Sequence, residues 1–170
     1  MQRSGPTHSL IRPARRGDRR ALLRSIILLQ EAERRLEPRL RPGRAIAPAY
    51  YAQLRRRCLA WQGRIFVAEQ AGEVVGFVAV LTRVPFADLD DPPGTYALVT
   101  DLVIDPACRR KGLGRLLLGK AEAFARSRHA TELRIGVLAA NRPATNLYRK
   151  VGFAPCLALF GKRLRGASTG

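Results

Sequence analysis

The spacing of apolar residues changes at Gly63, and this change limits the fold more than any other feature of the sequence. Before Gly63, apolar residues recur every three or four positions over 19–36 and 49–62, which predicts two helices. After it, 64–70 and 73–82 are rich in β-branched residues and are separated by a short turn. That spacing predicts a β-hairpin.

Proline and aspartate residues mark the borders of the first elements. A short strand is expected over 9–14, and Asp18 is placed to cap the helix that follows it. The stretch 37–48 contains three prolines, so we expect an irregular connection there.

The second half of the chain alternates between strand and helix patterns. The stretch 83–94 carries three prolines and three aspartates and is expected to be a long loop. We expect strands over 95–105, 131–139 and 153–164, and helices over 112–128 and 143–151.

The order β-α-α-β-β-β-α-β-α-β predicts an α/β fold with a mixed, mostly antiparallel sheet flanked by helices. The length suits a single domain, placed over 9–164. A flexible leader is expected over 1–8 and a flexible tail over 165–170.

The chain is strongly basic, with 31 Lys+Arg against 13 Asp+Glu and a formal net charge of +18. Such a field attracts polyanions, so a nucleic-acid-binding protein is one candidate function. The cations are spread from Arg3 to Arg165, and no motif for binding RNA or DNA accompanies them. Dispersed surface charge is therefore the favoured interpretation, and nucleic acid stays an alternative.

Cysteine and histidine usage argues against a metal centre. Cys58, Cys108 and Cys156 lie far apart without a CxxC pair, and the chain has two histidines. No apolar run is long enough to span a bilayer. We expect a cytoplasmic protein with no bound metal and no membrane partner.

The stretch "CRRKGLGRLLL" (108–118) combines cations and glycines at the start of a predicted helix. Unpaired amides at a helix start attract anions, and glycine lets an anion approach the backbone. Neither a Walker-A loop nor a complete GxGxxG occurs. Alone, the pattern fits either a pyrophosphate site or a basic loop with a glycine-eased helix start.

The wider context resembles the GNAT superfamily of N-acetyltransferases. "DLVIDPACRRKGLGRLLL" is similar to that family's acetyl-CoA-binding segment, and "NRPATNLYRKVGF" (141–153) is similar to its second signature. The element order also matches the family's fold from residue 9 to about 164. The resemblance implies acetyl-CoA as cosubstrate and transfer of an acetyl group to a primary amine.

The resemblance also implies residue roles. Tyr148 would be the general acid that protonates the CoA thiolate, and Asp101 the general base, with Glu69 as a second candidate base. Many members of the family rely on a chain of water molecules instead, so the lack of a side-chain base stays an alternative. Asp101 is expected on the same strand face as Val99 and Val103. Cofactor binding is expected from Leu102, Val103, Ile104, Arg109, Arg110, Lys111, Gly112, Leu113, Gly114, Arg115 and Asn141.

Each of these residues also has a structural interpretation. Residues 102–104 suit a core strand, Tyr148 suits a packed sheet edge, and Asn141 suits a helix cap. Asp101 suits the end of a polar strand edge, or a site that binds the substrate's ammonium without acting as a base.

The acceptor amine is the least determined part of the hypothesis. In the family, the acceptor site is formed by segments that correspond here to 30–62 and 83–95, and the second contains Asp88, Asp90 and Asp91. A small molecule or a protein is an eligible acceptor, and a homodimer is left open. A domain that binds acyl-CoA as a sensor without turnover is a further alternative.

Overall fold

The structure is a computed structural model that describes residues 9–86, 90 and 92–162. The expected leader (1–8) and tail (165–170) lie outside the described residues, as do Asp88 and Asp91 of the predicted long loop.

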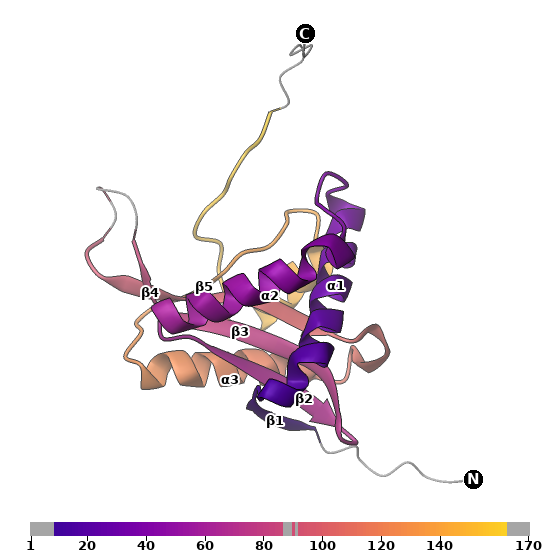
Figure 1. Cartoon of the computed structure of the whole chain (residues 1–170). Helices are drawn as coiled ribbons and strands as arrows, with labels where there is room; N and C mark the ends of the chain where they lie inside the picture. Colours follow the sequence, from indigo (N-terminus) through magenta and orange to yellow (C-terminus); the bar gives the residue numbers. More distant parts are fainter. Residues whose placement is uncertain (1–8, 87–89, 91, 163–170) are drawn as a thin grey trace.

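A five-stranded sheet forms the middle of the molecule, with its strands in the order β1-β2-β3-β4-β5 (Figure 1). All neighbours are antiparallel except β4 and β5, which are parallel. This confirms the mixed, mostly antiparallel sheet expected from the sequence. The strands are β1 (Leu10–Pro13), β2 (Arg64–Gln70), β3 (Glu73–Pro85), β4 (Thr95–Ile104) and β5 (Leu133–Ile135).

Helices cover both faces of the sheet (Figure 1). They are α1 (Arg19–Leu36), α2 (Gly43–Ala60), α3 (Leu113–Ser127) and α4 (Arg142–Lys150), with short 3-10 turns η1 (Arg16–Asp18) and η2 (Pro106–Cys108).

The helices on the two faces bury separate apolar cores. One core packs α1 and α2 against the sheet through Leu22, Ile26, Ala47, Leu54, Val67, Phe77, Ala79 and Val103. The other packs α3 against the opposite face through Leu113, Leu117, Leu118, Ala121, Phe66, Ala68, Val78, Val80 and Val99.

Helix α2 begins six residues before the predicted start, so the irregular connection expected over 37–48 is wrong in its second half. Glu31 of α1 accepts a 2.7 Å hydrogen bond from the Gly43 N–H, which caps the new helix start. A Cβ at Gly43 would lie 2.9 Å from the Ile27 carbonyl oxygen, so glycine allows α2 to start against α1. Pro48 then lies inside the helix, where its ring removes one backbone hydrogen bond.

The end of the chain also differs from the prediction. Strand β5 has three residues, whereas the pattern predicted a strand over 131–139. No strand forms over the described part of the predicted 153–164 strand, where Leu157, Leu159 and Phe160 are exposed. An apolar run becomes a strand only when a neighbouring strand satisfies its backbone groups, and the described chain supplies none there.

Asp18 precedes α1 as predicted, but its carboxylate does not cap that helix. It accepts hydrogen bonds from the Arg15 N–H and from both terminal nitrogens of the Arg12 guanidinium. The Arg12 Nε donates to Glu69 at 2.7 Å, so one arginine joins η1 to strands β1 and β2. The Arg12 side chain is 12% exposed, which makes this a largely buried cluster.

We expect Arg12→Met to lower the free energy of unfolding by about 3 kcal/mol at neutral pH, because two carboxylates would lose their cation. Arg12 holds the pKa of Asp18 below the usual range of an aspartate. The stabilisation is therefore fully present at a pH above the pKa of an unfolded aspartate, and it is lost as the pH falls through the lowered pKa of the folded state. Urea denaturation at several pH values measures it. Arg126→Met, which breaks an exposed pair with Glu122, is the control and should cost less than about 0.5 kcal/mol. Equal losses in both variants would contradict the prediction.

Candidate active site

An irregularity in β4 determines where Asp101 points. Asp101 lies opposite Ala79 of β3, and Val99 lies opposite the next residue, Val80, so Thr100 is an extra residue, a β-bulge. Beyond the bulge, the order in which successive side chains point to the two faces of the sheet is reversed. Val99 therefore packs in the core on the α3 face, whereas Asp101, like its partner Ala79, faces α1 and α2. The expectation that Asp101 shares a face with Val99 is wrong, and the bulge is the reason.

The Asp101 carboxylate is buried, with 2% of the residue exposed. It accepts a 2.8 Å hydrogen bond from the Tyr50 hydroxyl and a 2.7 Å hydrogen bond from the Thr100 hydroxyl. Burial raises the pKa of Asp101, and the two hydrogen bonds and the charge of Arg57 offset this only in part. A carboxylate in such a site accepts a proton more readily than one in water.

A cavity of about 180 Å³ gives access to this carboxylate. It lies between α1, α2 and β4, and apolar side chains from the two helices form part of its wall. Its polar lining consists of Gln30, Glu33, Tyr50, Thr100 and Asp101.

Glu33 is the functional candidate that the sequence interpretation missed. Burial and the negative charge of Asp101 raise the pKa of the half-buried Glu33 carboxyl. The signal was available, because Leu22, Ile26, Leu29 and Glu33 continue one helical stripe at spacings of four, three and four. A carboxylate on the buried stripe of a helix needs a partner or a function.

Tyr148 lies on α4 and is partly buried against the core on the α3 face. Its ring packs near that of Phe153, with centroids 6.0 Å apart. Burial, followed by the charge of Glu33, raises the pKa of Tyr148 to about 12, so the phenol keeps its proton at neutral pH. The charge of Asp101 raises the pKa of Glu33, and the charge of Glu33 in turn contributes to the raised pKa of Tyr148.

Strands β4 and β5 separate beside the bulge. Strand β5 pairs only with residues 97–99, whereas Leu102, Val103 and Ile104 pair with β3 alone. On their other edge, the described part of the chain supplies no strand. This open edge runs toward the start of α3, and Arg109 Nε donates to the Ile104 carbonyl at 3.0 Å where the two meet.

The start of α3 has the geometry of an anion site. Gly112 is its N-cap with φ 81°, and Arg110 also has a positive φ of 62°. The first-turn amides beyond Gly112 have no helical partners, and Arg110, Lys111 and Arg115 are exposed around them. Leu113 instead turns into the α3-face core.

Two predicted cofactor residues have structural contacts of their own. A Cβ at Gly114 would lie 2.9 Å from Leu147 Cδ2, so this glycine lets α4 pack closely on α3. The Asn141 side chain accepts a 3.2 Å hydrogen bond from the Ala144 N–H and caps α4.

Glu69 lies away from this site. Ala79 lies opposite Asp101 on one side and opposite Ile65 of β2 on the other. Glu69 is four residues beyond Ile65, which is about 13 Å further along β2. Its carboxylate pairs with Arg12. Asp90 of the predicted acidic loop is exposed in a turn.

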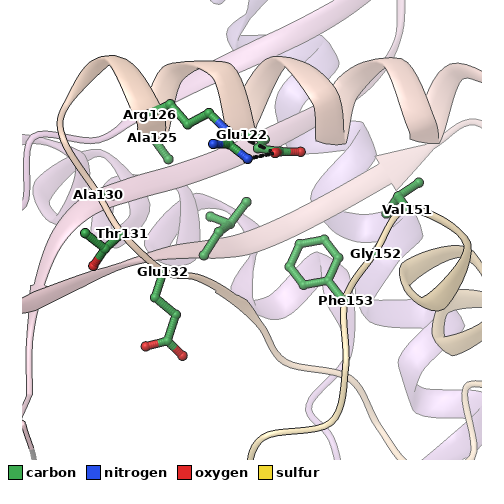
Figure 2. A pocket seen from close by; sticks show the side chains of 10 residues that line it. Glu122, Ala125, Arg126, Ala130, Thr131, Glu132, Val151, Gly152 and Phe153 are labelled. Atoms are coloured by element: carbon green, nitrogen blue, oxygen red, sulfur yellow. Dashed lines mark hydrogen bonds and ion pairs between the residues drawn. The ribbon is translucent and has the colours of Figure 1, made fainter.

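A second cavity, of about 220 Å³, lies near the C-terminal end of α3 and contains none of the predicted site residues. Figure 2 shows it between α3, the start of β5 and Phe153, with the ion pair of Glu122 and Arg126 on its rim. Within the described ranges, no three potential metal-ligating side chains gather in one place, and no helix is long and apolar enough to cross a membrane.

Comparison with proteins of known sequence finds acetyltransferases. Streptothricin acetyltransferase of Streptomyces lavendulae is 38% identical over 94 residues, covering 55% of this chain and 46% of that protein. An N-alpha-acetyltransferase of Sulfurisphaera tokodaii is 33% identical over 96 residues, covering 55% of this chain and 58% of that protein. The matches thus span about half the length of these curated relatives.

Solved structures share the fold at low sequence identity. The aminoglycoside N-acetyltransferase AAC(6')-Iy in complex with CoA has a TM-score of 0.70 and 14% identity, covering 97% of this chain and 100% of that chain. A GCN5-related N-acetyltransferase from Ralstonia eutropha has a TM-score of 0.70 and 20% identity, covering 94% and 100%. Residues 28–153 match the profile of the acetyltransferase (GNAT) family. That match covers most of the chain, and the chain therefore belongs to the acetyltransferase (GNAT) family.

Proposed function

We propose that the protein transfers the acetyl group of acetyl-CoA to a primary amine. The observation that carries the proposal is the β4 bulge, which turns the buried Asp101 into a cavity beside an open stretch of the same strand. A candidate proton acceptor and a strand edge without a neighbouring strand among the described residues thereby lie next to each other.

The residues present fit acetyl-CoA. The open edge of β4 over 102–104 offers backbone donors and acceptors to the amide groups of the pantetheine arm, as an added strand would need. The start of α3 offers free amides and exposed cations to the phosphates. Asn141 belongs to this proposal as the residue that positions α4, and hence Tyr148.

Bound acetyl-CoA would supply an activated acetyl group as a thioester, so that a C–N bond forms to the amine, the C–S bond breaks and the sulfur leaves as a thiolate. The Asp101 carboxylate accepts one proton from the substrate ammonium and leaves a neutral amine. Tyr148 donates its phenolic proton to the thiolate. The phenol is restored by the second proton that the nitrogen releases as it becomes an amide, so one proton in total passes to solvent through Asp101.

The cysteines bear on the proposed cellular location. Cys58, Cys108 and Cys156 form no disulfide, which suits a reducing compartment, and we propose a cytoplasmic location on that ground.

Release of free CoA thiol tests the proposed function, with polyamines, amino acids, aminoglycosides and peptides as acceptors. We expect Tyr148→Phe to lower kcat about 100-fold, because the leaving thiolate loses its acid, and to change CoA affinity less than about twofold. Tyr96→Phe removes a hydroxyl at the far end of β4 and is the control. Unchanged kcat in Tyr148→Phe would remove this residue from the mechanism, and absence of CoA binding by the parent protein would overturn the proposed function.

Asp101→Asn separates activity from stability. The pKa of Asp101 is raised in the folded protein. Between the pKa of the unfolded chain and that of the folded protein, the folded state holds a proton that the unfolded chain has lost, so stability falls as the pH rises through this interval. Asn does not titrate and can keep both hydrogen bonds, because the Thr100 hydroxyl can accept as well as donate. We therefore expect an equal or higher Tm at pH 8, a smaller difference near pH 4, and about 100-fold lower kcat/KM. Asp90→Asn is the control, and a Tm several degrees lower at pH 8 would contradict the prediction.

Charge removal at the start of α3 tests phosphate binding better than a change at Gly114, whose substitution would also disturb Leu147. Replacing Arg110, Lys111 and Arg115 together by Ala should weaken CoA binding about 10- to 100-fold at low salt and flatten its salt dependence. Calorimetric titration at two salt concentrations measures both. The control removes the same charge from the exposed residues Arg16, Arg19 and Arg20. Equal loss in both variants would show that only the general positive field matters.

A further inference from the structure

We infer that Glu33 binds the cationic nitrogen of the acceptor and selects a primary ammonium on an unbranched carbon. The inference rests on the proposed acetyl transfer, since it assigns the acceptor end of the same site.

Glu33 is exceptional among the carboxylates of the described chain. Every other buried or half-buried carboxylate there pairs with an arginine or accepts a hydrogen bond. Glu33 is half-buried and has no such partner among the described residues. In a chain with 31 Lys+Arg and 13 Asp+Glu, a half-buried carboxylate without a cation is unusual.

The two arginines that follow Glu33 in the chain are occupied or turned away. Arg34 follows Glu33 directly, but its Nε donates to the Leu40 carbonyl at 2.9 Å and its guanidinium pairs with Glu31 at 2.9 Å. Arg35 is exposed. Glu33 instead lies on the stripe of α1 that lines the cavity with Gln30. Its carboxylate is therefore available to a ligand that enters the cavity.

Two carboxylates in one small cavity repel each other, and each is costly to keep ionised. The charge of Asp101 adds to the effect of burial at Glu33. An ammonium bound between them would relieve the repulsion and offset the desolvation of both groups. The cavity therefore favours a ligand that brings one positive charge.

The size of the cavity limits the shape of that ligand. About 180 Å³ is below the range of sites that enclose a whole drug-sized molecule, so the cavity can hold only the end of a larger acceptor. Its apolar wall suits a short alkyl segment, and its carboxylates suit the three N–H donors of a primary ammonium. A primary ammonium on a branched carbon would keep its three donors but add bulk, and a tertiary ammonium would present a single N–H donor.

The same arrangement favours release after reaction. In the proposed transfer, one proton of the bound ammonium passes to the Asp101 carboxylate and none passes to Glu33. The acetylated nitrogen is a neutral amide, so the attraction of Glu33 for the ligand ends with the transfer.

The test compares Glu33→Gln with the matched control Glu73→Gln, an exposed residue at the β2–β3 turn. NMR titration of each protein with n-butylammonium chloride and with n-butanol measures binding to the cavity without requiring turnover. We expect saturable binding of n-butylammonium to the parent protein and to Glu73→Gln, at least tenfold weaker binding to Glu33→Gln, and equal n-butanol affinities in all three. Equal n-butylammonium affinity in the parent protein and Glu33→Gln, or no saturable binding by the parent, would overturn the inference.

Kinetics with the best acceptor from the thiol-release panel give a second readout. Glu33→Gln should raise the KM for the amine at least tenfold and change kcat less than threefold. It should leave the CoA affinity unaffected. The rate with methoxyamine should also be unaffected, because methoxyamine is uncharged at neutral pH. A purely structural role would lower the rates with both nucleophiles and would contradict the inference. Failure of CoA binding would overturn the acetyl-transfer proposal alone, because the n-butylammonium titration is read independently of it.

Discussion

The extra residue at Thr100 is the constraint on which the site depends. In a regular strand, Asp101 would lie on the α3 face with Val99, among apolar side chains and without access to the cavity. The bulge reverses the alternation, so the carboxylate faces α1 and α2. It also coincides with the point where β5 stops pairing with β4, because bulges increase local twist and disturb the ladder. One backbone irregularity thus orients the proposed proton acceptor and lies beside the strand edge that β5 leaves unpaired.

The fold was predictable where an element is specified by its own residues. The apolar periods located α1, α3 and the β2–β3 hairpin, since helix and strand patterns are local. The start of α2 was not predictable, because it depends on Glu31 capping Gly43 across a turn of the chain. The residues over 153–162 have the apolar pattern of a strand but form none, because no described strand pairs with them. Strand pairing depends on a second segment and cannot be predicted from one segment alone.

Of the candidate site, the sequence predicted the residues that belong to the two family motifs. Asp101 and Tyr148 follow from the resemblance, and Asp101 lines the same cavity as Glu33. Glu33 itself belongs to no motif, and its proximity to Asp101 results from the packing of α1 over a bulged strand. Gly114 shows the converse, because a residue assigned to cofactor binding also has a packing contact with Leu147. Chemistry assigned from a motif is therefore incomplete until the groups that surround it are known.

The charges around the candidate site differ in sign from one region to the other. A chain with net charge +18 attracts an anionic cosubstrate and repels a cationic acceptor at long range. At physiological salt, charges further than about 8 Å apart are largely screened, so inside the cavity the nearby carboxylates determine the potential. Exposed cations surround the start of α3, and Glu33 and Asp101 line the cavity between α1, α2 and β4. The proposed substrates have opposite charges, and each would enter the region of β4 that attracts it, so the two reacting groups would meet at the open strand edge between those regions.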